Sequence, residues 1–104
     1  MSLRKKIVLA AKEAEGTATS KLTSELRRQA YFAGISHGRK LNVKLNDGNY
    51  VVTYPKSIED QVFHSEYGNE STPPTPVIRN FISDIPFNHL DRHFGESLKK
   101  HGVI

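Results

Sequence analysis

Residues 40–54 read KLNVKLNDGNYVVTY and are the most strongly patterned part of the chain. Apolar and polar side chains alternate along residues 40–45, which is typical of a half-buried β-strand. Asp47-Gly48 favours a tight turn, because glycine adopts a positive φ at little cost. Residues 50–54 are β-branched and aromatic, and Pro55 ends the strand because it cannot donate to a sheet. The stretch therefore predicts an antiparallel hairpin.

The chain before the hairpin has helical periodicity. One apolar stripe has spacings of three and four residues: Leu3, Ile7, Ala10, Ala11 and Ala14. A second has a spacing of four: Leu22, Leu26 and Ala30. Ser2 suits an N-cap and Gly34 suits the position after a helix C-terminus. Gly16 and the Thr/Ser cluster of residues 17–20 weaken the helix, so the sequence leaves open a break or a kinked continuation there.

Beyond the hairpin, residues 57–61 suit a short helical turn, and residues 62–67 are expected to form a third strand that closes at Gly68. Residues 69–76 contain three prolines, which favour a stiff, extended loop. A helical pattern then resumes at Val77 and restarts near Asp84 and Pro86. Its apolar side chains lie three and four residues apart in both parts. They are Val77, Ile78, Phe81, Ile82, Phe87, Leu90, Phe94 and Leu98.

Together these elements predict an α+β fold. It has a small antiparallel sheet of three or four strands, with an N-terminal helix or helices and a C-terminal helix packed on it, plus an extended Pro-rich loop. The 104 residues suit a single domain. Its parts are the helical N-terminal part (1–33), the sheet (39–68), the projecting loop (69–76) and the C-terminal helical part (77–102).

The amino-acid composition limits the classes of function that the chain can have. The chain has no cysteine, which excludes disulfides and thiolate chemistry. No stretch approaches 18 consecutive apolar residues, so we expect no membrane-spanning helix. A basic start and a short apolar run are signal-peptide features, but Lys12, Glu13 and Glu15 follow at once, and the segment fits a helix better.

The sequence offers little for catalysis. His89 and His93 share a helix face, but the residue after His89 is Leu90 rather than the Glu of a zinc-protease motif. His64 beside Glu66 allows a small hydrolase as a rival hypothesis, with both side chains on one side of a strand. The chain has no nucleophile elbow and no phosphate-binding loop. We therefore expect no enzyme activity, no metal and no cofactor.

The formal net charge of +4 permits attraction to nucleic acid. The candidate basic residues, facing DNA or a partner, are Arg27, Arg28, Arg39 and Lys40. Four aromatic side chains could stack on bases, or fill the core face and the edge of the sheet instead: Tyr50, Tyr54, Phe63 and Tyr67. A small basic nucleic-acid-binding module is thus the alternative to a protein-assembly role.

Residues 66–81 read EYGNESTPPTPVIRNF. They combine the end of the predicted third strand, a turn at Gly68, a stiff proline-rich arm and the apolar start of a helix. A stiff, exposed arm loses little entropy when it docks, so it suits a protein interface. An ordinary long loop is the alternative.

This segment resembles the neck and tail-completion proteins of long-tailed bacteriophages, often described as tail components or minor tail proteins. Many of them have a strand ending in Glu-aromatic-Gly, a polar loop with proline, then Pro, two apolar residues and Arg. The matching residues are Glu66, Tyr67, Gly68, Pro76, Val77, Ile78 and Arg79. Thr19-Ser20-Lys21-Leu22, with Arg27-Arg28 after it, is similar to a Thr-Gly-x-Leu element of the family, with Ser20 in place of Gly.

The resemblance implies a structural subunit of the virion neck or tail top, assembled in the host cytoplasm. It implies a ring of six copies, or a multiple of six, that contacts head-completion, tail-terminator or tail-tube proteins. DNA would pass through as cargo, and no membrane is involved. The arm and the matching residues would form the protein interface: Glu66, Tyr67, Gly68, Pro73, Pro74, Pro76, Val77, Ile78 and Arg79.

Overall fold

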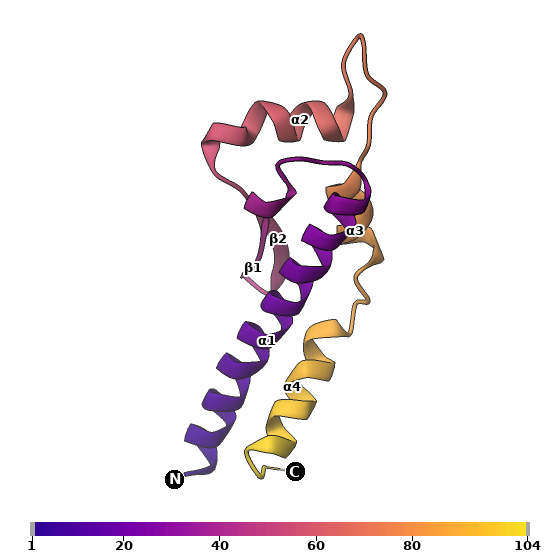
Figure 1. Ribbon diagram of the computed structural model, residues 1–104. Helices are drawn as coiled ribbons and strands as arrows, with labels where there is room; N and C mark the ends of the chain where they lie inside the picture. The colour runs from indigo at the N-terminus through magenta and orange to yellow at the C-terminus, as the bar shows by residue number, and fades with distance from the viewer. Residues whose placement is uncertain (1, 104) are drawn as a thin grey trace. The chain divides into compact units, whose positions relative to one another are not determined.

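The computed structural model describes residues 2–103 (Figure 1). The chain divides into two compact units. One unit combines the chain up to Lys21 with the segment from Pro86 onward, and the other is Leu22–Ile85. Helix α1, Leu3–Phe32, contributes residues to both units.

Helix α1 runs without a break through Gly16–Ser20, which settles the question that the sequence left open. Thr19 Oγ1 donates to the carbonyl of Glu15 at 2.8 Å, so its hydroxyl is satisfied inside the helix. The buried stripe also continues with a spacing of four: Ala10, Ala14, Ala18, Leu22, Leu26 and Ala30. The expected stripe is wrong at Leu3 and Ile7, whose side chains are exposed.

Both ends of α1 follow the local signals. The backbone N–H of Lys5 donates to Ser2 Oγ at 3.2 Å, so Ser2 caps the first turn. At the other end Gly34 has a φ of 78°, and the N–H of Ile35 donates to the carbonyl of Ala30 at 2.9 Å. This bond closes a glycine C-cap, as the sequence predicted.

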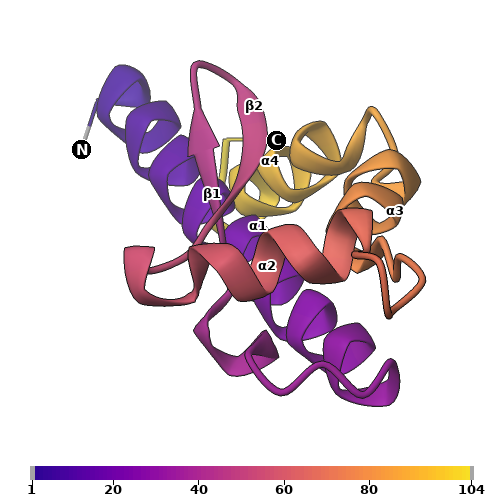
Figure 2. The same ribbon diagram turned by 90° about the horizontal axis from the view of Figure 1, so that it is seen from above.

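The predicted hairpin is confirmed. Strands β1, Asn42–Asn46, and β2, Asn49–Thr53, pair antiparallel with Val43 opposite Val52. Asp47 and Gly48 both have positive φ, 51° and 81°, which matches the right-handed twist of the flanking strands. The strands lie side by side in both views (Figure 1, Figure 2).

The expected sheet of three or four strands is wrong, because among residues 2–103 the sheet has only β1 and β2. The segment predicted as a third strand is part of helix α2, Glu59–Tyr67, which follows a 3₁₀ turn at Lys56–Ile58. Its buried side chains repeat every four residues: Ile58, Val62 and Glu66. The buried carboxylate of Glu66 hid this helical period, since an acidic residue does not read as part of an apolar face. Glu59 and Asp60 also suit the positive end of a helix.

The C-terminal helical part consists of two helices, α3 (Val77–Asp84) and α4 (His89–Lys100). The unit Leu22–Ile85 has its core where the second half of α1, the hairpin, α2 and α3 meet. The buried core residues are Leu22, Leu26, Ala30, Leu41, Val43, Ile58, Val62 and Phe81. None of the helices in residues 2–103 combines the length and hydrophobicity that a membrane crossing requires.

In the other unit, α4 lies beside the first half of α1 (Figure 1). Glu13 on α1 accepts hydrogen bonds from Lys100 Nζ, at 2.6 Å, and from His101 Nε2. These bonds, Lys100 first, hold the pKa of the Glu13 carboxyl below its ordinary value of 4.5. After α4, Gly102 has a φ of 74° and ends the helix as predicted.

The Glu13 contacts predict an acid-dependent stability. A carboxyl whose pKa is lowered by folding stabilises the fold above its ordinary pKa, and this contribution disappears as the pH falls through the folded value. We expect Glu13→Gln to be less stable than the native chain at pH 7, with a difference that shrinks below pH 4.5. Urea midpoints at several pH values check this. Glu15→Gln is the matched control, and a Glu13→Gln difference that does not vary with pH would contradict the assignment.

Candidate functional site

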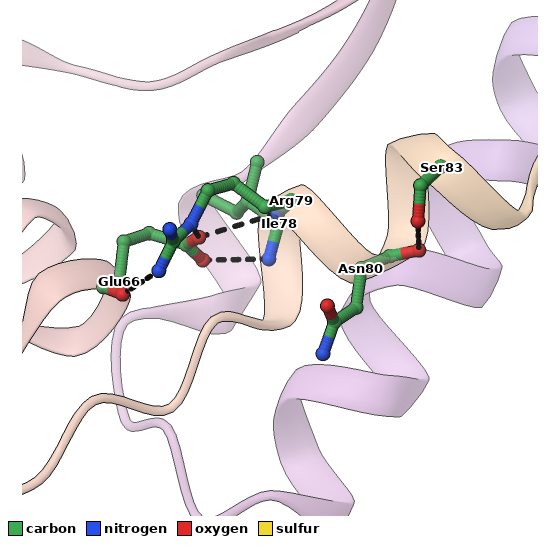
Figure 3. Close-up of polar contacts among 5 residues, drawn as sticks. All are labelled: Glu66, Ile78, Arg79, Asn80 and Ser83. Atoms are coloured by element: carbon green, nitrogen blue, oxygen red, sulfur yellow. Dashed lines mark hydrogen bonds and ion pairs between the residues drawn. The ribbon is translucent and has the colours of Figure 1, made fainter.

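The carboxylate of Glu66 joins α2 to the start of α3 (Figure 3). Glu66 is 5 % exposed, and it accepts the backbone N–H of Ile78 at 2.6 Å and that of Arg79 at 3.2 Å. The first N–H groups of a helix have no partner inside the helix. Pro76, at the N-cap position of α3, offers no side-chain acceptor. Glu66 therefore caps α3 from another helix, and its negative charge faces the positive end of the α3 dipole.

Arg79, in the first turn of α3, binds the end of α2 in return. Its Nε donates to Glu66 Oε2 at 3.2 Å, and its Nη2 donates to the backbone carbonyl of Glu66. That carbonyl lies in the last turn of α2, where carbonyls lack helical partners. The guanidinium also lies over the ring of Tyr67, 4.4 Å from its centroid. The C-terminus of α2 and the N-terminus of α3 thus cap each other, an arrangement that we call the cap exchange.

The loop between these helices is held by hydrogen bonds from its backbone N–H groups, to the Asn69 side chain and to the end of α2. The Asn69 Oδ1 accepts the N–H groups of Ser71 and Thr72 at 2.9 and 2.8 Å, and the N–H of Thr75 donates to the carbonyl of Ser65 at 2.7 Å. Residues 69–75 are all exposed. Figure 1 shows the loop extending beyond the end of α2 before it turns back to α3. The loop therefore projects, with a defined backbone path.

Gly68 is the point at which the loop leaves α2. Its φ of 74° and ψ of 179° belong to a region that only glycine adopts readily. A Cβ on Gly68 would lie 2.8 Å from the Pro74 nitrogen and 2.8 Å from the Thr72 carbonyl oxygen. The path of the loop therefore depends on having glycine at this position.

Four of the nine proposed interface residues form the base of the loop: Glu66 and Arg79 in the cap exchange, Gly68 where the loop begins, and half-buried Pro76 where it ends. The other five divide into two groups. Tyr67, Pro73 and Pro74 are exposed, as an interface requires. Val77 and Ile78 instead pack against the core of Leu22–Ile85. Their part in any interface is therefore to position the loop and α3.

The basic residues do not form one free surface. The guanidinium of Arg27 donates to the carbonyl of Leu41 and to Asn42 Oδ1, both at 2.9 Å, and so ties α1 to the start of β1. Arg28 pairs with Glu25 at 2.6 Å. Arg39 and Lys40 are exposed in the short 3₁₀ turn Gly38–Lys40.

The rival hydrolase pair is not assembled. On helix α2, residues two apart point to different sides, so the strand geometry expected for His64 and Glu66 is wrong. His89 and His93 do share a helix face, with ring centroids 4.7 Å apart. Across residues 2–103, no three His, Asp or Glu side chains gather closely enough to hold a metal ion.

Two hollows near the cap exchange were not predicted from the sequence, although the sequence groups the aromatic side chains that line the second as one candidate surface. Burial lowers the pKa of His37, which lines a pocket of about 270 Å³ beneath the loop, while the negative charge of Glu66 opposes this shift. A larger groove, of about 390 Å³, lies between β2, α2 and α3, with Tyr54, Phe63 and Tyr67 exposed on it. A helical reading of residues 58–67 would have placed Phe63 and Tyr67 together, since they are four apart.

No protein-family model, no curated protein and no solved structure matches this chain. The functional interpretation therefore depends on three local observations: the cap exchange, the exposed loop and the groove with exposed aromatic side chains.

Proposed function

We propose that this chain is a structural subunit of a bacteriophage neck or tail top, which forms a ring that helps to join the DNA-filled head to the tail. The ring would hold six copies or a multiple of six, and its neighbours would be head-completion, tail-terminator or tail-tube proteins. The subunit would be part of the virion after assembly in the host cytoplasm. DNA would pass through the ring as cargo. The subunit itself would contact no membrane.

The observation that carries the proposal is the cap exchange. Glu66 and Arg79 are 13 positions apart, both belong to the pattern that resembles the neck proteins, and they bond to each other. The contact brackets the loop and leaves Pro73 and Pro74 exposed. A loop with a fixed base loses less entropy on docking than a free segment, which suits an assembly contact.

We do not propose the hydrolase based on His64 and Glu66, because the buried carboxylate of Glu66 already accepts hydrogen bonds from Ile78 and Arg79. The nucleic-acid alternative is weakened by Arg27, whose donors serve the chain's own backbone and Asn42. A nucleic-acid module would retain duplex DNA at physiological salt, with affinity falling steeply as salt rises. Such retention by the isolated protein would favour that alternative over the neck proposal.

The loop supplies a prediction for assembly. We expect replacement of Pro73 and Pro74 with glycine to leave the chain folded but to weaken docking about tenfold. Each such change frees the undocked loop by about 0.4–1 kcal/mol of chain entropy, and 1.4 kcal/mol corresponds to a factor of ten. The measurement is the yield of joined particles in electron micrographs of lysates. Pro86→Gly, at an exposed proline outside the loop, is the control. An unchanged yield for the loop variant would count against the loop as an interface.

The location is tested directly by a C-terminal peptide tag and gold-labelled antibody on purified particles. Label at the head–tail junction, together with separate heads and tails when the chain is absent, is the expected result. Label elsewhere on the particle, or normal joining without the chain, would refute the proposal.

A further inference from the structure

The N-terminal end of α1 carries two features that are unfavourable in an isolated chain. It exposes apolar side chains: Leu3, Ile7, Val8 and Leu9. Cations stand among them: Arg4, Lys5 and Lys6. The first turn holds no acidic residue, so these cations oppose the positive end of the helix dipole. We call these seven side chains the N-terminal patch. An apolar surface with a negative rim would relieve both features.

Such a surface exists in the unit Leu22–Ile85. The groove of about 390 Å³ between β2, α2 and α3 has apolar walls, which include Val52 and Ile82, and we call it the aromatic groove. Phe63 and Tyr67 stand on it as a ring pair with centroids 5.0 Å apart, exposed by 58 % and 57 %. Glu59 and Arg79 line the groove, and Asp60 follows Glu59 in α2. The charge of Arg79 is paired with Glu66, which leaves the acidic side chains in the first turn of α2 to attract a cationic partner. Neither Glu59 nor Asp60 belongs to an ion pair within residues 2–103.

We propose that the N-terminal patch of one copy docks against the aromatic groove of a second copy. The patch has a hollow of its own, about 410 Å³, with Val8 and Leu9 as apolar lining and Ser2, Arg4 and Lys5 around them. Its apolar part suits the protruding ring of Phe63. The cations of the patch can pair with Glu59 and Asp60 in the first turn of α2. The two surfaces are therefore complementary both in charge and in apolar character.

The two surfaces consist of different residues, so the contact is heterologous. Each copy offers its patch to one neighbour and its groove to the next, which generates a closed ring or an open filament. The inference depends on the proposed function only for the expectation that the assembly closes as a ring.

A second copy explains the patch better than an anionic membrane does. Ile7, Val8 and Leu9 are consecutive, so their side chains point about 100° apart around α1. A helix that lies on a membrane buries one apolar face. Apolar side chains on several sides of a helix instead suit a concave protein surface.

The test uses two charge insertions in the full chain, Val8→Asp in the patch and Phe63→Asp in the groove. Both positions are exposed, so circular dichroism should show native helix content. Sedimentation velocity of the native chain should show concentration-dependent oligomers. Each variant alone should associate at least about 100-fold more weakly, because it would bury an unpaired carboxylate. An equimolar mixture should form a one-to-one dimer and nothing larger, since each variant keeps the surface that the other lacks.

Phe87→Asp, at a fully exposed side chain outside both surfaces, should assemble like the native chain. A monomeric native chain, a mixture that stays monomeric, or assembly that survives both insertions would overturn the inference. Binding of the native chain to phosphatidylserine vesicles, lost in Val8→Asp, would assign the patch to a membrane instead. Oligomers without a role in particle joining would refute only the proposed function. If heads and tails still join in the presence of either Val8→Asp or Phe63→Asp, only the docking of the N-terminal patch on the aromatic groove would be refuted.

Discussion

Replacing Glu66 with alanine is expected to lower the free energy of unfolding by about 2–3 kcal/mol. The change removes a buried carboxylate that accepts the N–H groups of Ile78 and Arg79. Those donors would face the interior without a partner, and burying unsatisfied polar groups is costly. Urea denaturation gives the size of the loss. Faster amide exchange at Ile78 and Arg79 would show that the loss occurs at the start of α3.

Two controls separate capping from general charge effects. Glu70→Ala, at an exposed acid in the loop, should change stability by no more than about 0.5 kcal/mol. Arg79→Ala should cost less than Glu66→Ala, because the backbone bonds to Glu66 survive and the Arg79 side chain is half exposed. If Arg79→Ala were as damaging as Glu66→Ala, the ion pair rather than the cap would join the two helices.

The second large effect is expected for Gly68→Ala, which should destabilise the chain by about 2–3 kcal/mol. The new methyl group would make the φ of 74° unfavourable and would lie 2.8 Å from backbone atoms of Thr72 and Pro74. Since backbone cannot move aside as a flexible side chain does, the loop must change its path. Thermal melting gives the loss of stability, and amide exchange at Thr75 reports the displaced loop.

Gly16→Ala is the matched control, with the opposite sign. Gly16 lies inside α1, and a Cβ there would meet nothing within 4 Å. Alanine should therefore stabilise the helix by about 0.5–1 kcal/mol. Equal effects of the two substitutions would show that the conformation of Gly68 imposes no special constraint.

The candidate site was only partly predictable. The sequence predicts an interface in residues 66–79, and the structure shows that Pro73 and Pro74 in this segment are exposed. The strand predicted for residues 62–67 was wrong, because they belong to a helix that brings the rings of Phe63 and Tyr67 into contact. The aromatic set Tyr50, Tyr54, Phe63 and Tyr67 does line one groove. The role of Glu66 was also out of reach, because the amides that it caps belong to residues 12 and 13 positions further on. Sequence spacing alone gives no sign of such a contact.

The sequence by itself determined the features that depend on the local backbone. Asp47-Gly48 specified the hairpin turn, and Gly34 and Gly102 specified helix ends, because positive φ is a property of single residues. Only the tertiary structure decided that residues 59–67 form a helix and that Glu66 is buried. Burial of a carboxylate is favourable only when donors from elsewhere in the chain surround it. Those donors come from α3, whose position depends on the packed core and not on its neighbours in sequence.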